Sequence, residues 1–252
     1  MSALFAELAH VDTAMGELAL RRRREPQRQV DVYEVKLGDE FLMSSLFTVA
    51  EIALARLGLA RMDREPLAVV VGGLGLGYTA EAVLADRRVA ELLVVEALEP
   101  VIDWHEAGLL PVSGALTGDD RCHLVVGDFF ALARGEVGFD ARAPGRRVDA
   151  ILVDIDHSPV HTLAPAHADL YTAAGLRRLS RFLAPGGVFG LWSDDAPDDG
   201  FLALLTEAFD EASAEVVDFA NFLTGGTSSN TVYLASTPAV TDDPSAHRSE
   251  IP

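Results

Sequence analysis

The sequence predicts an α/β fold built on a mostly parallel sheet. Between residues 67 and 192, short apolar runs alternate with stretches in which apolar residues recur at helical spacing. Such runs are typical of strands buried on both faces of a parallel sheet, with helices as the crossovers. Near the C-terminus, two more strand-like runs are joined by a short loop instead of a helix, which predicts an antiparallel pair.

The composition limits the function classes that need to be considered. A chain of 252 residues, 49% of them hydrophobic, is long enough for one α/β domain with a small appendage. The formal net charge of -19 sets up a field that repels nucleic-acid phosphates and anionic lipids, so we expect neither nucleic acid nor a membrane as partner. An acidic surface attracts a cationic amine substrate, but it is also an ordinary route to solubility.

The single cysteine, Cys122, excludes a disulfide framework and a cysteine-based zinc cluster, and we expect no metal. The N-terminal stretch MSALFAELAH lacks the basic region and the continuous apolar run of a secretory signal. No stretch approaches the roughly 20 apolar residues that a membrane span requires. These features predict a cytoplasmic protein.

Residues 1–45 are predicted to form a small N-terminal β region. Two strand-like stretches, 16–24 and 30–35, are separated by the breaker EPQRQ, and a turn follows at residues 38–40. The basic run Arg21 to Arg24 fits the solvated edge of an exposed strand, and we assign it no chemistry.

Residues 46–237 are predicted to form the main domain. Apolar residues recur at helical spacing from Leu46 to Leu59, before the first parallel strand. The predicted parallel strands are LAVVV (67–71), LLVVE (92–96), HLVVG (123–127), DAILVD (149–154) and GVFGLW (187–192), and the antiparallel pair is AEVVDFANF and NTVYLAST. This seven-stranded layout resembles the Rossmann-like class I methyltransferase fold. Residues 238–252 are polar with scattered Pro and Ser, which predicts a disordered tail.

A glycine-rich turn between the first parallel strand and the next helix predicts a nucleoside-binding site. Gly73, Gly75 and Gly77 allow the backbone to turn sharply and approach a ligand at the helix N-terminus. Glu96 ends the next strand about 20 residues later, where a carboxylate can accept hydrogen bonds from ribose hydroxyls. A tight structural turn and a surface carboxylate are the simpler explanations of these residues.

Asp128 and Phe129 follow the third strand at the same edge of the sheet. Asp128 is a candidate acceptor for an adenine amino group, and Phe129 a candidate neighbour of the base. An alternative is an NAD-dependent oxidoreductase, because residues 75–80 also fit the dinucleotide fingerprint with Glu96 as the ribose acceptor. That alternative explains neither Asp128 nor the antiparallel terminal pair.

The segment VDIDHSP is the candidate chemical centre. Asp154, Asp156 and His157 follow a buried strand at the edge of the sheet that carries the glycine turn. Transfer of a group from a sulfonium compound to an amine needs a base that removes the ammonium proton, and a carboxylate at Asp154 suits that role. Capping and chain-breaking residues at the end of a strand are the competing explanation.

These motifs, in this order, resemble those of spermidine synthases over most of residues 30–193. The matching pieces read GGLGLGYT, VVEALEP, VVGDFF, VDIDHSP and LYTAAGLRRLSRFLAPGGVFGLWS. The resemblance implies that Asp154 stands in the place of the family's amine-deprotonating aspartate, and Glu96 and Asp128 in the ribose and adenine roles. It also implies S-adenosylmethionine or its decarboxylated form as cosubstrate, an amine acceptor, and compatibility with a homodimer.

The sequence departs from the family pattern at three places. The glycine turn carries Leu74 and Leu76 where the family has an aspartate that holds the aminopropyl amine. Residues 42–44 replace a polar tyrosine-histidine-glutamate cluster, and His157 lies near the place of the second aspartate of the family motif. Fold kinship is therefore better supported than the choice of a polyamine substrate.

Three functional hypotheses follow from these residues. The first is a spermidine synthase-like transferase that moves an aminopropyl group to an amine. The second is a methyltransferase of an unidentified small molecule, in which Asp154 and Asp156 only shape the acceptor site. The third is a paralogue that binds a nucleoside or a partner protein without catalysis.

Overall fold

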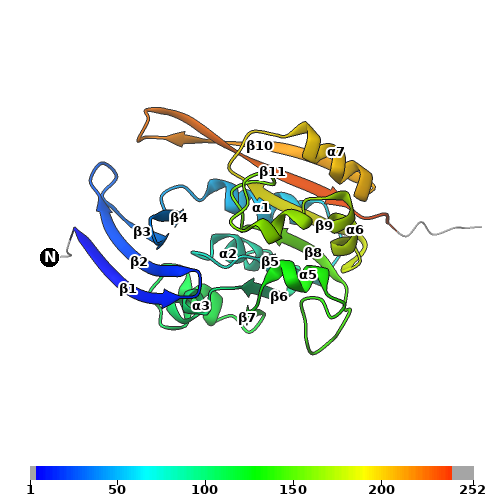
Figure 1. Ribbon diagram of the computed structural model, residues 1–252, viewed down its shortest axis with the longest axis horizontal. Coiled ribbons are helices and arrows are strands. Elements are labelled where there is room, and N and C mark those ends of the chain that lie inside the picture. The colour runs from blue at the N-terminus through cyan, green and yellow to red at the C-terminus, as the bar shows by residue number, and fades with distance from the viewer. Residues whose placement is uncertain (1–3, 240–252) are drawn as a thin grey trace, which may run out of the picture.

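The computed structural model describes residues 4–239, which form two sheets (Figure 1). The N-terminal sheet has four antiparallel strands in the order β1-β2-β3-β4. The second sheet has seven strands in the order β10-β11-β9-β8-β5-β6-β7. This arrangement confirms the predicted fold, a mostly parallel seven-stranded sheet with an antiparallel C-terminal hairpin and a separate N-terminal β region.

The N-terminal sheet consists of β1 (Phe5–Thr13), β2 (Gly16–Glu25), β3 (Val30–Leu37) and β4 (Glu40–Ser44). Strand β1 was not predicted, because its sequence FAELAHVDT does not alternate cleanly between apolar and polar residues. This strand lies at the edge of the sheet and pairs only with β2. The basic run of β2 is ion-paired to neighbouring strands: Arg21 to Glu7 at 3.4 Å, Arg23 to Glu34 at 2.6 Å and Arg24 to Asp31 at 3.1 Å.

The parallel part of the large sheet contains five strands. They are β5 (Leu67–Gly72), β6 (Val89–Glu96), β7 (Cys122–Val126), β8 (Val148–Val153) and β9 (Leu183–Ser193). Strands β10 (Glu211–Asn221) and β11 (Gly226–Ser236) form the hairpin, and β11 pairs antiparallel to β9. The strand order reverses between β5 and β8, which pair in parallel, and ligands of open α/β sheets bind outside the carboxyl ends of strands at such a point.

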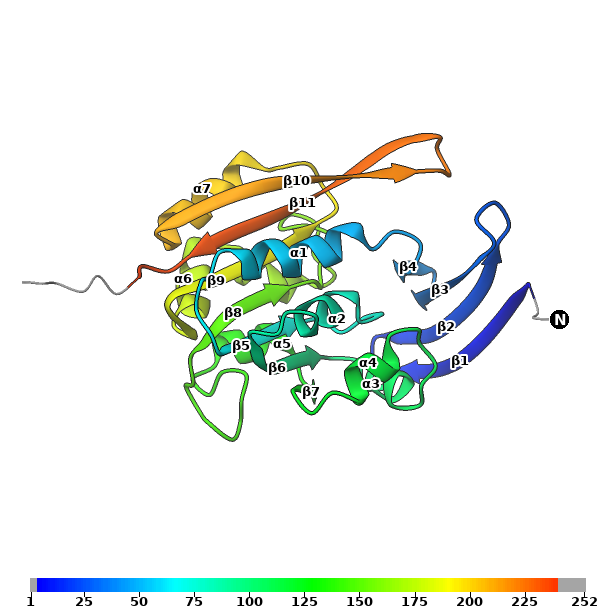
Figure 2. The ribbon, with the colours of Figure 1, turned by 180° about the vertical axis from the view of Figure 1, so that it is seen from behind.

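Helices cover both faces of the large sheet. One face carries α1 (Val49–Ala60), α2 (Tyr78–Leu84), α3 (Glu99–Glu106) and α4 (Ser113–Thr117), as Figure 2 shows. The other carries α5 (Phe129–Arg134), α6 (Ala173–Ser180) and α7 (Asp199–Ala208), with the short 3-10 helix η1 (Pro165–Asp169) before α6. The core therefore has two apolar layers, one on each face of the sheet.

Two glycines let α1 pack closely against the sheet. A Cβ on Gly58 of α1 would lie 2.9 Å from the Leu152 side chain, and one on Gly190 of β9 would lie 2.8 Å from Leu152 and 2.9 Å from Leu54. The close contact holds the first turn of α1, which carries Glu51, at the edge of the sheet. The fold thereby sets the position of a side chain of the candidate site.

The described chain ends just after β11. The Pro238 carbonyl accepts a hydrogen bond from the Gly186 amide at 2.9 Å, which ties the first residue of the predicted tail to β9. Residues 240–252, the rest of that predicted tail, lie outside the described residues. Within residues 4–239, every helix is too short or too polar to cross a bilayer.

We expect Gly190→Val to lower the free energy of unfolding by about 1–3 kcal/mol, because the added side chain overpacks Leu152 and Leu54. Chemical denaturation measures this change. Gly114→Ala is the control, since a Cβ at this helical position meets nothing within 4 Å and is expected to stabilise by about 0.5–1 kcal/mol. Equal effects of the two substitutions would contradict the close packing of α1.

Candidate active site

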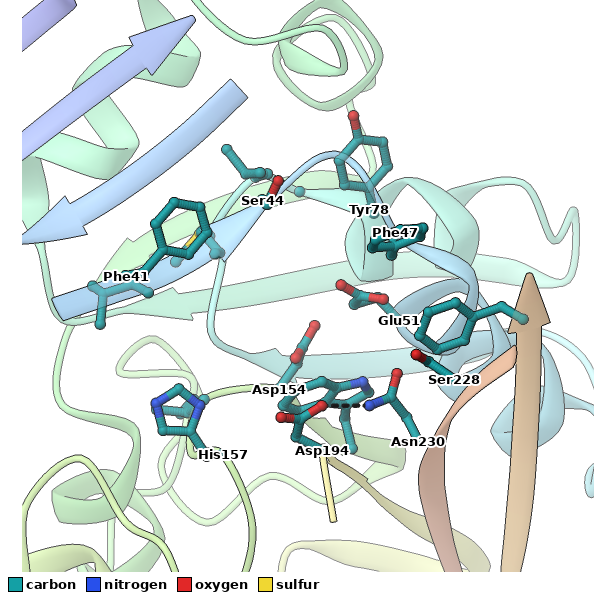
Figure 3. Close-up of a pocket in the computed structure, with 18 of the residues that line it drawn as sticks. Phe41, Ser44, Phe47, Glu51, Tyr78, Asp154, His157, Asp194, Ser228 and Asn230 are labelled. Carbon is teal, nitrogen blue, oxygen red and sulfur yellow. Dashed lines mark hydrogen bonds between the residues drawn. The ribbon is translucent and has the colours of Figure 1, made fainter. Parts of the chain in front are cut away.

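A cavity of about 550 Å³ opens at the carboxyl ends of the central strands (Figure 3). Its wall combines five parts of the chain: β4, the first turn of α1 with the residues before it, the glycine turn, the ends of β8 and β9, and the β10–β11 hairpin. The cavity thus lies between the N-terminal sheet and the large sheet, at the point where the strand order reverses.

Three carboxylates project into the cavity from different elements, as Figure 3 shows. Asp154 follows β8, Glu51 lies in the first turn of α1, and Asp194 follows β9. Asp154 accepts a hydrogen bond from the Thr79 hydroxyl at 2.6 Å, and Asp194 accepts one from the Asn230 side-chain amide at 2.7 Å. The cavity therefore has a strongly acidic region on its large-sheet side.

Burial and mutual repulsion change the protonation of this acidic region. Burial, followed by repulsion from Asp154 and Asp194, raises the pKa of Glu51 from 4.5 to about 8. Burial also raises the pKa of Asp154 to about 6, against the lowering effect of the hydrogen bond from Thr79. Near neutral pH, Glu51 is therefore mostly protonated and Asp154 mostly ionised, so the pair holds one proton.

The opposite wall is apolar. Strand β4 contributes Phe41, Leu42 and Met43, and the residues before α1 contribute Phe47. The Phe47 ring packs against Phe219 and Phe222 of the terminal hairpin, with ring centroids 5.4 and 5.6 Å apart. Aromatic contacts between the segment before α1 and the terminal hairpin thus close this side of the cavity.

The glycine turn lies directly against the end of β8. Gly73 has a φ of +92°, and a Cβ there would lie 2.1 Å from the Asp154 carbonyl oxygen, so the position excludes any side chain. Gly75 and Gly77 line the cavity, and Gly77 precedes α2. Met43 fills the space beside Gly75, because a Cβ there would lie 2.8 Å from the Met43 sulfur.

Glu96 contacts the glycine turn but does not line the cavity. Its carboxylate accepts hydrogen bonds from the backbone amides of Leu74 at 3.0 Å, Gly75 at 3.4 Å and Leu98 at 2.8 Å. Burial raises the pKa of Glu96, and these amide donors oppose the shift. The structure therefore gives Glu96 a role in holding the turn, and its contact with ribose stays a prediction.

Asp128 and Phe129 lie at the end of β7, outside the cavity. Asp128 caps α5 by accepting hydrogen bonds from the amides of Phe130 at 2.9 Å and Ala131 at 3.1 Å. Phe129 is 2% exposed and stacks on Phe139 with centroids 5.0 Å apart. Both residues have structural roles in this arrangement, and their contacts with adenine stay predictions.

Asp156 and His157 point to different places. Asp156 is buried and accepts hydrogen bonds from the Leu163 amide at 2.7 Å, His167 Nδ1 at 2.8 Å and the Tyr171 hydroxyl at 2.7 Å. It anchors the segment after β8 and does not line the cavity. His157 does line it, and its carbonyl accepts a hydrogen bond from the Asp194 amide at 2.7 Å.

Sequence reasoning missed Glu51, Asp194 and Asn230. Nothing in the sequence marks Glu51 as a site residue, because an acidic residue in the first turn of a helix is favoured by the helix dipole alone. The position of Asp194 could have marked it, because this residue directly follows a buried parallel strand at the edge of the sheet that bears Asp154. Asn230 is placed by the pairing of β11 with β10 and β9, which the sequence does not specify residue by residue.

The residues present fit a nucleoside with a sulfonium tail. Gly75 and Gly77 border the cavity, where a cationic tail would meet Asp154. The Glu96 carboxylate lies against the turn, where Oε2 accepts hydrogen bonds from the Leu74 and Gly75 amides and Oε1 accepts one from the Leu98 amide. Met43 beside Gly75 is unbranched and can turn aside. Within residues 4–239, no group of three or more His, Cys, Asp or Glu side chains could hold a metal ion.

Comparisons with known proteins bear on the fold. No family model matches the sequence. Spermidine synthase from Thermotoga maritima superposes with a TM-score of 0.70 at 17% identity, covering 93% of this chain and 74% of that one. A spermidine synthase in complex with the transition state analogue AdoDATO gives 0.68 at 15% identity, covering 93% and 73%. A probable spermidine synthase from Corynebacterium glutamicum ATCC 13032 gives 0.62 at 17% identity, covering 90% and 79%.

The similarity to these structures confirms that the chain has a spermidine synthase-like fold of the class I methyltransferase type. An activity does not follow from a shared fold at this level of identity, because one fold hosts many reactions.

The raised pKa of Glu51 predicts a pH-dependent stability. A carboxyl group with a higher pKa in the folded chain binds its proton more tightly there, so the free energy of unfolding falls as pH rises from 4.5 to about 8. We expect Glu51→Gln to remove part of this fall and to be more stable than the wild type at pH 9.

Denaturation at pH 5, 7 and 9 measures this difference. Glu106→Gln, an exposed change on α3, is the control and is expected to follow the wild type at each pH. A wild-type to Glu51→Gln difference that stays constant across the three pH values would contradict the raised pKa.

Proposed function

We propose that this protein is a transferase that binds a sulfonium nucleoside and moves an aminopropyl group to an amine held in the cavity. The donor of an aminopropyl group is decarboxylated S-adenosylmethionine, because intact S-adenosylmethionine carries an aminocarboxypropyl group and would serve the alternative, methyl transfer. The observation that carries the proposal is the presence of Asp154, Glu51 and Asp194 together in a cavity bordered by the glycine turn.

The acidic region suits a cationic amine. Asp154 and Asp194 offer negative charge, and desolvation in the cavity strengthens their attraction for an ammonium group. The proton on Glu51 reduces the repulsion among the three carboxylates when the cavity is empty of cations. An entering ammonium favours release of that proton, because an opposite charge stabilises the ionised carboxylate.

We assign Asp154 the role of the base. A sulfonium cosubstrate supplies a carbon next to a positive sulfur, so that transfer breaks a carbon–sulfur bond and forms a carbon–nitrogen bond. The amine must lose a proton for its nitrogen lone pair to attack, and the carboxylate of Asp154 accepts it. A pKa of about 6 leaves Asp154 ionised at neutral pH but more basic than an ordinary aspartate, which favours proton transfer.

Isothermal titration separates this proposal from its alternatives. Tighter binding of decarboxylated S-adenosylmethionine than of S-adenosylmethionine supports aminopropyl transfer, and the reverse preference supports methyl transfer. Tight binding of NAD would overturn both, and binding of none of these compounds would favour a protein without catalysis.

We expect Asp154→Asn to lower kcat for amine transfer by about 10²–10⁴-fold while leaving the affinity for the nucleoside nearly unchanged, because an amide cannot accept the proton. Turnover is measured by product formation and affinity by titration. Asp103→Asn, an exposed change on α3 outside the cavity, is the control and is expected to keep full activity. Unchanged turnover in Asp154→Asn would remove this residue from the mechanism.

A further inference from the structure

We infer that the acceptor is an amine with a single ammonium group on an apolar body, and that Phe41 and Phe47 select against a second ammonium group. The inference rests on the proposed function and specifies the substrate class of the same cavity. It follows from the uneven distribution of charge around the cavity wall.

The carboxylates that line the cavity are gathered in one region. Among the described lining residues, only Glu51, Asp154 and Asp194 are acidic, and all three come from α1 or the ends of β8 and β9 (Figure 3). One ammonium group placed among them is paired with negative charge and can donate hydrogen bonds. A second ammonium group at the other end of a linear diamine would have to lie outside this region.

The part of the wall formed by β4 and the segment before α1 offers little to a charged group. Of the lining residues on β4 and before α1, only Ser44 has a polar side chain, and its hydroxyl already accepts a hydrogen bond from the Leu46 amide at 3.2 Å. The other lining residues there are Phe41, Leu42, Met43 and Phe47.

An ammonium group taken out of water against this wall loses its hydration without gaining a carboxylate partner. Attraction to the faces of the phenylalanine rings offsets only part of that loss. An alkyl or aryl body gains from the same wall, because it removes apolar surface from water. The cavity therefore favours an amine that is charged at one end only.

The cavity has the size of a small-molecule site. Its volume of about 550 Å³ falls within the roughly 300–1,000 Å³ of small-molecule sites. The Phe47, Phe219 and Phe222 contacts hold the apolar wall in place between the N-terminal sheet and the hairpin.

Three compounds of equal length test the inference on the wild-type protein: hexylamine, 1,6-diaminohexane and hexan-1-ol. Titration calorimetry without cosubstrate measures their affinities at pH 7.5. We expect hexylamine to bind at least tenfold more tightly than 1,6-diaminohexane, and hexan-1-ol to bind too weakly to measure. Equal or tighter binding of the diamine overturns the inference, as does equal binding of the alcohol or no binding of any amine.

A substitution on the apolar wall gives the second test. Phe41 is 48% exposed, so Phe41→Asp adds a carboxylate without removing a core residue. We expect it to lower the hexylamine to diamine affinity ratio at least fivefold. Val30→Asp is the matched control, because Val30 belongs to the same sheet, is 45% exposed and does not line the cavity. The same change in ratio in both variants would overturn the role of Phe41.

The outcomes separate this inference from the proposed function. Binding is measured without a sulfonium compound, so a preference for hexylamine without any transfer product would support the acceptor class and contradict the transferase proposal. Transfer to 1,6-diaminohexane in preference to hexylamine would support the transferase and overturn the acceptor class.

Discussion

The contact between the glycine turn and the end of β8 fixes the relative positions of the groups around the cavity. The Asp154 amide donates a hydrogen bond to the Gly72 carbonyl at 2.8 Å, and Gly73 lies too close to the Asp154 carbonyl for any side chain. Both contacts involve backbone atoms of neighbouring parallel strands. The Asp154 carboxylate is therefore held beside the turn by the sheet itself, which is a rigid support for a reacting group.

The rigid fold also holds two carboxyl groups, Glu51 and Asp154, in an environment that disfavours their charges. Close packing of α1 through Gly58 and Gly190 brings Glu51 towards Asp154, and burial leaves the two acids with little water to screen them. Burying two neighbouring acids lowers the stability of the fold. Such groups of shifted pKa are concentrated at sites that bind or transform a ligand. Packing of Leu54 and Gly58 thus helps to determine the protonation of Glu51, which lies on the same face of α1.

The fold could be predicted from the sequence because buried parallel strands appear as continuous apolar runs, although the exposed edge strand β1 gave no such signal. The site was predicted in part. Asp154 follows from its place at a strand end, whereas Asp156 and Glu96 lie at the same edge but turn to donors within the protein. Side-chain direction in loops depends on which backbone and side-chain donors need an acceptor, and residue spacing does not contain that information. Glu51 was missed because its helix position has an ordinary explanation.

The residues that line the cavity include Phe41 of β4 and Asn230 of β11, which are far apart in the sequence. The Phe47 ring packs on Phe219 and joins these two parts of the wall. During synthesis the N-terminal sheet and the glycine turn leave the ribosome long before the hairpin does. A complete binding site therefore exists only once the last two strands have been translated and paired. Occupancy of the cavity would then stabilise finished molecules and leave nascent or truncated ones unprotected against proteolysis.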